Sequence, residues 1–204
     1  MRAFARAQTG VGQTNTRHNA PVVLFGSEGG GAGVLTASPL AFAKALAYLV
    51  TSPRPAPPYA HAASSLSGEL YAPFHRGRGG PGGWIILNEP ELHLHGDVLV
   101  PDIGGWRRER MPSLPSGSAF ELAPDWVCEV LSASTEELDR GKKLRIYARE
   151  GVTHVWLVNP ILRTLEVLSL ARGVFRLTAS HEGGANIAAA PFDAIELDLG
   201  ALWV

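Results

Sequence analysis

Residues 124–132 of the chain read PDWVCEVLS. After the proline, the run is rich in branched and aromatic residues, and this composition predicts a strand that carries Glu129 near its end. An earlier apolar run at 97–100 stops at Pro101-Asp102 and so delivers a second carboxylate. A lone buried carboxylate is unstable unless it is protonated, paired or bound to a cation. Spacing alone leaves two interpretations open: an oxygen-ligand site for Mg²⁺, or a turn aspartate and a solvent-facing glutamate.

The residues that follow this strand predict a helix. Residues 134–137 match a capping box with Ser134 as the N-cap, and the helix is expected to end at Gly151. It carries Lys142 and Lys143, and a lysine one to two turns into the helix can fold back over the strand ends. Two carboxylates and a lysine suit phosphodiester hydrolysis, because a metal polarises a phosphoryl oxygen while an ammonium positions the attacking water.

Four segments of the chain together resemble a known family. They are VPD at 100–102, PDWVCEVLS at 124–132, Asp139 with Lys143 and Tyr147, and GVTHVWLVNP at 151–160. In their order and spacing they are similar to the Uma-type restriction endonuclease family, formerly a domain of unknown function, within the PD-(D/E)XK nuclease-like superfamily. The resemblance covers residues 51–204 and implies a restriction-endonuclease-like core.

The resemblance also implies roles for particular residues. Asp102 and Glu129 would be the two acids that hold the metal, with the carbonyl of Val130 as a further ligand, and Lys143 would steady the attacking water. In the commonest form of the superfamily the lysine lies two residues after the second acid, where this chain has Leu131. The family instead supplies the lysine from the following helix.

Two questions stay open at the level of sequence. At about 100° per residue, either Lys142 or Lys143 can point inward, so helical geometry does not choose between them. The family usually enters its N-terminal part through a Gly-Glu-Leu strand, whereas this chain has Tyr48 in the run before residues 51–55. If the missing glutamate serves the active site, the chain is a catalytically impaired nuclease-fold module that binds DNA or another protein.

The fold class expected is α/β, a restriction-endonuclease-like core with a mixed β-sheet flanked by helices. The strand, helix, strand unit at 126–158 fits a right-handed crossover between parallel strands. Residues 46–204 are expected to form this domain. Residues 1–45 show no sustained hydrophobic period and are expected to be a poorly ordered or diverged N-terminal extension.

Composition is consistent with one sizeable core, since the chain has 204 residues, of which 46% are hydrophobic and 18% charged. No apolar run approaches the roughly 18 residues of a membrane span, and no signal peptide is recognised, so a cytoplasmic protein is expected. The single cysteine, Cys128, excludes an internal disulfide. On a regular strand it lies on the face opposite its neighbours, where a packed thiol is expected.

The net charge of −1 is not typical of a strong nucleic-acid binder. Local basic clusters, such as Arg107 to Arg110, could still contact phosphates once a metal holds the backbone. Two weaker site candidates stay open: Glu89 or Glu91 as a third carboxylate, and the pair His93 and His95 as zinc ligands.

The sequence therefore predicts an endonuclease that depends on Mg²⁺ or Mn²⁺ and hydrolyses phosphodiester bonds in DNA. DNA is the expected partner, a membrane is not, and a homodimer is possible because nuclease folds often cut both strands as dimers. The alternative is the catalytically impaired binding module.

Overall fold

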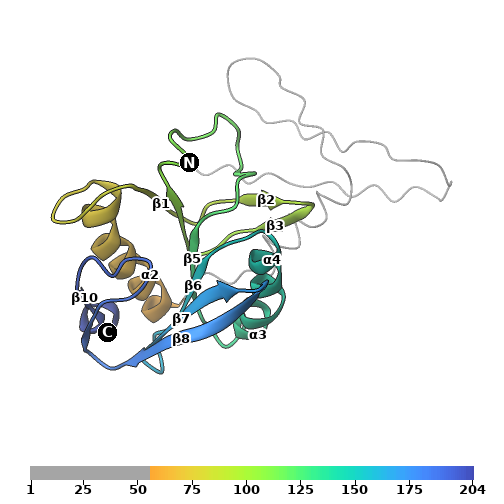
Figure 1. Cartoon of the computed structure of the whole chain (residues 1–204). Helices are drawn as coiled ribbons and strands as arrows, with labels where there is room; N and C mark the ends of the chain where they lie inside the picture. Colours follow the sequence, from red (N-terminus) through yellow and green to blue (C-terminus); the bar gives the residue numbers. More distant parts are fainter. Residues whose placement is uncertain (1–55) are drawn as a thin grey trace, which may run out of the picture. The chain divides into compact units, whose positions relative to one another are not determined.

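The structure, a computed structural model, describes residues 56–204, which form a six-stranded sheet with helices on both faces (Figure 1). The predictions made for residues 1–45 and for the segment around Tyr48 lie outside the described residues.

The sheet is mixed, as predicted. Its strands lie in the order β1-β4-β5-β6-β7-β8. Within this sheet β5 and β6 run parallel, and the other neighbouring pairs are antiparallel. The strand bounds are β1 (Trp84–Asn88), β4 (Ile103–Arg107), β5 (Trp126–Val130), β6 (His154–Asn159), β7 (Thr164–Ala171) and β8 (Val174–Glu182).

Two small ribbons complete the β-structure. Antiparallel β2 (Leu92–Leu94) and β3 (Asp97–Leu99) form one of them, and antiparallel β9 (Asn186–Ile187) and β10 (Leu197–Asp198) form the other. The second ribbon is followed by the short 3₁₀ helix η3 (Leu199–Leu202).

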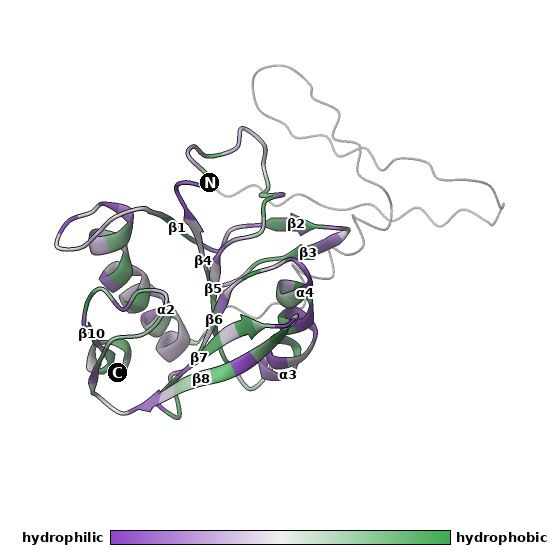
Figure 2. Ribbon diagram, viewed as in Figure 1, coloured by the Kyte–Doolittle hydropathy of each residue, from purple (hydrophilic) through white to green (hydrophobic). Residues whose placement is uncertain are grey.

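Helices cover the two faces of the sheet. Helix α2 (Pro57–Leu70) continues into the π-helical turn η1 (Tyr71–His75) on one face. On the other face, α3 (Glu136–Leu138), the π-helical turn η2 (Asp139–Lys143) and α4 (Leu144–Arg149) follow one another without a break. We call this run the 136–149 helix. It connects the parallel strands β5 and β6, which is the predicted crossover, and Figure 2 shows its first turns as largely hydrophilic.

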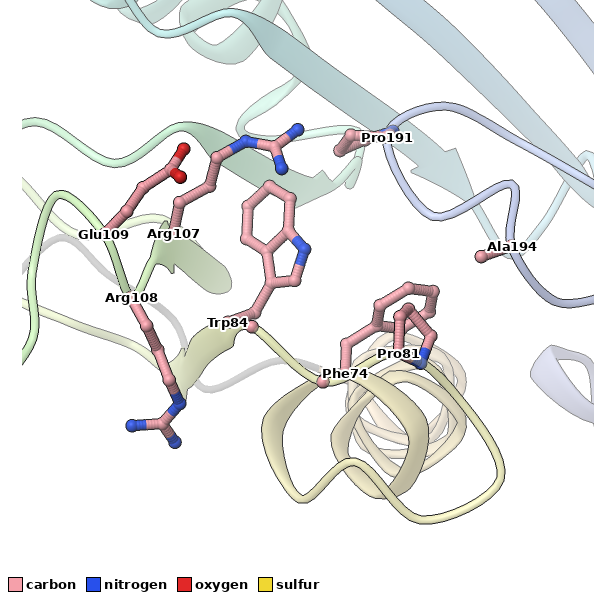
Figure 3. Close-up of a pocket in the computed structure, with 10 residues that line it drawn as sticks. Phe74, Pro81, Trp84, Arg107, Arg108, Glu109, Pro191 and Ala194 are labelled. Carbon is pink, nitrogen blue, oxygen red and sulfur yellow. The ribbon is translucent and has the colours of Figure 1, made fainter.

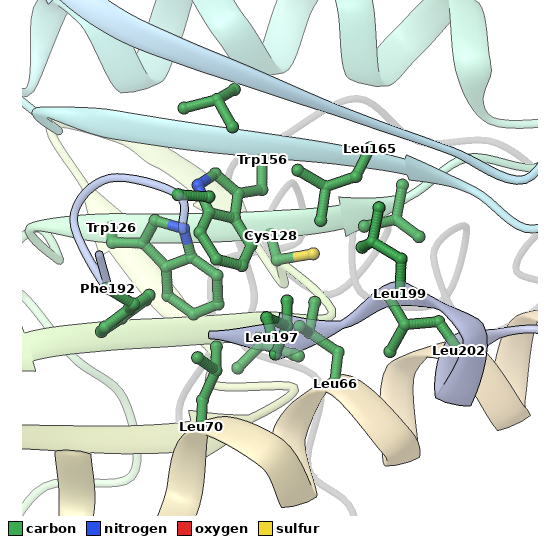
Figure 4. Packing of buried hydrophobic residues seen from close by; sticks show 14 of the residues in the cluster. Leu66, Leu70, Trp126, Cys128, Trp156, Leu165, Phe192, Leu197, Leu199 and Leu202 are labelled. Atoms are coloured by element: carbon green, nitrogen blue, oxygen red, sulfur yellow. The ribbon is translucent and has the colours of Figure 1, made fainter. Parts of the chain in front are cut away.

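The alternation of side chains along β5 divides the core between the two faces. Trp126, Cys128 and Val130 belong to the cluster on the α2 face, where Cys128 lies among large apolar side chains (Figure 4). Val127 belongs to the cluster on the α4 face. Cys128 is therefore a packed thiol on the face opposite its neighbours, as predicted, and burial raises the pKa of the thiol well above its ordinary value.

Strand β4 has a sequence that is not typical of a strand. The pair Gly104-Gly105 is typical of a turn, yet both glycines lie in β4. A Cβ at Gly104 would lie 2.9 Å from Pro90 Cγ, and one at Gly105 would lie 3.0 Å from Trp126 Cε3. The absence of side chains at these two positions makes room for large neighbours.

The predicted helix start was also wrong in detail. The residue before α3 is Thr135 rather than Ser134, and no side chain caps the helix. The hydroxyl of Ser132 instead lies 3.0 Å from the hydroxyl oxygens of both Ser134 and Thr135. The predicted end is confirmed, because Gly151 follows the helix with a φ of +77°. Within residues 56–204 no helix is long and apolar enough to cross a membrane.

Candidate active site

Strand pairing brings the two predicted carboxylates to the same end of the sheet. Glu129 lies on β5 and is 1% exposed. Asp102 comes directly before β4, whose first residue, Ile103, lies opposite Cys128. Asp102 Oδ2 accepts a hydrogen bond of 2.6 Å from the backbone N–H of Val130, the residue after Glu129.

Two side chains of the 136–149 helix donate to the Glu129 carboxylate. Lys143 Nζ lies 2.8 Å from Glu129 Oε2, and the hydroxyl of Tyr147 donates to Glu129 Oε1 over 2.6 Å. Each carboxylate oxygen therefore has its own donor. Tyr147 is fully buried in the cluster on the α4 face.

A third carboxylate lies on the same helix. Asp139 is 2% exposed. Its Oδ1 forms an ion pair of 2.9 Å with Lys143 Nζ. The same oxygen accepts no hydrogen bond within the described residues. The ammonium of Lys143 thus lies between the carboxylates of Asp139 and Glu129. The next residue, Arg140, binds both carboxylate oxygens of Glu166 on β7 at 2.6 and 3.0 Å, which ties this part of the helix to the sheet.

Burial and the surplus of negative charge shift the pKa values of Glu129, Asp102 and Lys143. Burial raises the pKa of Glu129 to about 7, and the charges of Asp139 and Asp102 add to this effect while Lys143 opposes it. Burial likewise raises the pKa of Asp102, against the Val130 hydrogen bond. For Lys143 burial disfavours the ammonium, but the carboxylates of Glu129 and Asp139 outweigh burial and raise its pKa. The lysine is therefore a fixed positive charge.

The structure answers the question that helical geometry left open. Lys143 contacts Glu129, whereas Lys142 is exposed. Leu131 is 1% exposed and belongs to the apolar cluster on the α4 face, so that position has no room for a charged group. Two residues without a role in the sequence analysis, Asp139 and Tyr147, join the site. They belong to the pattern, with four-residue spacing around Lys143, that carries the family resemblance.

Among the weaker candidates, only Glu89 adjoins this cluster: its backbone N–H donates to the carbonyl of Asp102 over 3.0 Å, and its charge adds to the raised pKa of Asp102. Glu91, His93 and His95 have other partners. Glu91 pairs with His93 at 2.6 Å, and His95 pairs with Glu150 at 2.7 Å. Strand β1 ends before Glu89, which has a φ of +47°, so the strand does not continue through Pro90. No group of three His, Cys, Asp or Glu side chains within residues 56–204 could hold a metal ion by itself.

The donors at the site nevertheless fit one divalent cation. Mg²⁺ typically binds one or two carboxylates in a protein and takes its other oxygen ligands from water and substrate phosphates. Asp102 and Glu129 offer two carboxylates, and the cluster holds three carboxyl groups against one ammonium. A cation would offset the repulsion from Asp139 and Asp102, which adds to burial in raising the pKa of Glu129.

A pocket in the described part of the chain lies away from this cluster. Its volume is about 420 Å³, and Trp84, Arg107 and Arg108 are among its lining residues (Figure 3). Trp84 and Arg107 face each other at one end of the β1–β4 ladder, and Asn88 and Ile103 face each other at the other end, next to Asp102. The carboxylate cluster and this pocket therefore lie at opposite ends of β4.

Comparisons with known proteins identify the family and the fold. A family model described as Uma2, putative restriction endonuclease, matches residues 48–200. Among solved structures, the chain is similar to a putative nuclease belonging to DUF820 from Anabaena variabilis. The TM-score is 0.60 and the identity 20%, over 74% of this chain and 82% of that one. At this identity the likeness establishes the nuclease fold alone. No curated protein matches the chain.

Proposed function

Because the chain belongs to the Uma2 family of putative restriction endonucleases, we propose that it is a divalent-metal-dependent endonuclease that hydrolyses phosphodiester bonds in DNA. One observation carries the proposal: the buried carboxylate of Glu129, next to Asp102, accepts a hydrogen bond from Lys143. A buried acid, a second acid and a lysine in one cluster match the groups that such a hydrolysis needs.

Asp102 and Glu129 would hold Mg²⁺ or Mn²⁺, together with the carbonyl of Val130. When bound, the cation would polarise a phosphoryl oxygen and favour ionisation of water. The hydrogen bond from the Val130 N–H fixes the direction of the Asp102 carboxylate. The two acids are then ready as oxygen donors before any cation arrives, and a rigid strand supports each of them.

Lys143 would act on the attacking water and on the developing negative charge. Its raised pKa keeps the ammonium charged, because the attraction of Glu129 and Asp139 exceeds the effect of burial. A permanently protonated lysine cannot serve as the general base, so its role would be electrostatic and orienting. Removing a preorganised donor of this kind typically lowers the rate by about 10²–10³-fold.

The test is cleavage of plasmid and single-stranded DNA with Mg²⁺ or Mn²⁺. We expect wild type to cleave, and we expect Glu129→Ala and Lys143→Ala to lose activity by about 100-fold or more. Lys142→Ala is the matched control, because Lys142 is the adjacent lysine on the same helix and is exposed. It should retain wild-type activity.

The result also separates two accounts of the protein. Cleavage that survives both Glu129→Ala and Lys143→Ala would mean that this cluster is not the active site. Absence of cleavage by wild type on either substrate, with DNA still bound, would favour the catalytically impaired binding module. Calorimetric titration of wild type and Asp102→Ala with Mn²⁺ adds a readout that does not depend on the substrate.

A further inference from the structure

Two buried polar side chains on the 136–149 helix have no part in the chemistry above. Asp139 contacts Lys143, and Tyr147 contacts Glu129. We propose that both are positioning residues with separable effects: Tyr147 orients the metal ligand Glu129, and Asp139 orients the ammonium of Lys143. The inference rests on the proposed function and assigns residues that act through its two central groups.

The contact made by Tyr147 is short and protected. Its hydroxyl lies 2.6 Å from Glu129 Oε1, while Lys143 Nζ lies 2.8 Å from Oε2. Donors on both oxygens fix the rotation of the carboxylate about its own axis. The tyrosine ring is fully buried, so the hydroxyl has little freedom to move away. A hydrogen bond to a metal ligand typically contributes about 10–100-fold to metal affinity.

The contact made by Asp139 acts on a different group. The lysine side chain is long and has many rotamers, so one partner alone does not fix the place of its ammonium. Nζ lies 2.8 Å from Glu129 and 2.9 Å from Asp139, which come from different elements. Without Asp139 the ammonium would keep its bond to Glu129 but lose its second anchor. The effect should therefore fall on the chemical step more than on metal binding.

The π-helical turn explains how residues 139, 143 and 147 lie on one face of the helix. In a regular α-helix each four-residue step overshoots a full turn by about 40°, so the last of the three would lie about 80° from the first. The turn η2 spans Asp139–Lys143, and its i→i+5 hydrogen bonds hold more residues per turn. This reduces the angular overshoot between Asp139 and Lys143 and keeps both side chains on the helix face that is directed toward Glu129.

The experiment measures Mn²⁺ affinity by calorimetry and, separately, the cleavage rate at saturating Mn²⁺. Tyr147→Phe should weaken Mn²⁺ binding by about 10–100-fold, and saturating Mn²⁺ should restore most of the rate. Asp139→Asn should change Mn²⁺ affinity less than Tyr147→Phe does, yet lower the saturated rate by about tenfold or more. Tyr71→Phe is the control, because Tyr71 lies on the η1 turn at the opposite face of the sheet.

Each outcome is decisive. If wild type neither binds Mn²⁺ nor cleaves DNA, the proposed function fails and this inference fails with it. If wild type does both and Tyr147→Phe binds Mn²⁺ as wild type does, the role of Tyr147 is overturned while the function stands. A wild-type saturated rate in Asp139→Asn overturns the role of Asp139. Thermal unfolding without metal identifies a variant that does not fold, and the other variant then decides whether the inference holds.

Discussion

Among single residues, Glu129 has the charge state most sensitive to its surroundings. Its buried carboxyl has a pKa of about 7, so a bound cation must displace a proton from a substantial fraction of molecules near neutral pH. We predict that Mn²⁺ affinity rises as the pH increases through 7 and levels off above it. Calorimetry in buffers of different ionisation enthalpy should detect the release of protons when Mn²⁺ binds. Glu129→Gln should abolish both Mn²⁺ binding and this proton release.

The same group makes the metal-free protein sensitive to pH. The folded pKa of about 7 exceeds the ordinary value of 4.5, so between these two values the folded state binds more protons than the unfolded state. The free energy of unfolding should therefore fall as the pH rises through this window. Urea denaturation at several pH values should show a smaller fall in Glu129→Gln. Equal slopes would contradict the raised pKa.

The identity of the site lysine shows which features of individual residues can be predicted from the sequence and which cannot. The strand pattern placed one carboxylate in an apolar run around residue 129, but it left open whether Glu129 belongs to a metal site or faces solvent. The choice of Lys143 over Lys142 depended on the rotation of a helix that contains a π-turn, and a regular period does not reveal such a turn. The same pattern contained Asp139 and Tyr147, but the sequence did not show which groups they contact.

Among the secondary-structure elements, strand β4 has the least space for added side-chain atoms. A Cβ at Gly104 would lie 2.9 Å from Pro90 Cγ and 3.1 Å from the ring of Trp106. We predict that Gly104→Ala lowers the free energy of unfolding by about 1–3 kcal/mol, measured by urea denaturation.

Gly68 provides a control, because its substitution is expected to change the free energy of unfolding in the opposite direction. A Cβ at Gly68 would meet no atom within 4 Å, and Gly68 lies in α2, where alanine is the better helix former. Gly68→Ala should raise the free energy of unfolding by about 0.5–1 kcal/mol. Destabilisation by both substitutions would point to a general intolerance rather than to crowding at β4.

The predicted and unpredicted elements differ in a physical way. Strands β5 and β6 were predicted because branched and aromatic residues dominate them. Strand β4 was not predicted because its glycine pair is typical of a turn. The glycines make room for Pro90 and for tryptophan rings, and this reason is visible only in three dimensions. The helix start was misplaced because the hydroxyls of residues 132, 134 and 135 contact one another instead of capping the helix.

For the whole molecule, the C-terminal segment is part of the core rather than a tail. Phe192 packs against four aromatic rings, with centroid distances of 4.6 to 5.6 Å, contributed by Phe74, Trp84, Trp126 and Trp156. We predict that Phe192→Ala lowers the free energy of unfolding by about 3–5 kcal/mol. Leu177→Ala on β8 is the control, because Leu177 is 58% exposed and should change stability by less than about 0.5 kcal/mol.

The π-turn also has a consequence for how this helix tolerates insertions and deletions. An i→i+5 turn accommodates one residue more than a regular turn does, and Gly141 lies within it without any neighbour near an added Cβ. Deleting Gly141 would let the backbone become a regular α-helix and so need not unfold it. Because the lost residue and the lost π-turn compensate for each other, the side chains after the deletion would keep nearly the same direction relative to those before it. A deletion in the regular part of the same helix would instead rotate the following side chains by about 100° and separate them from their partners.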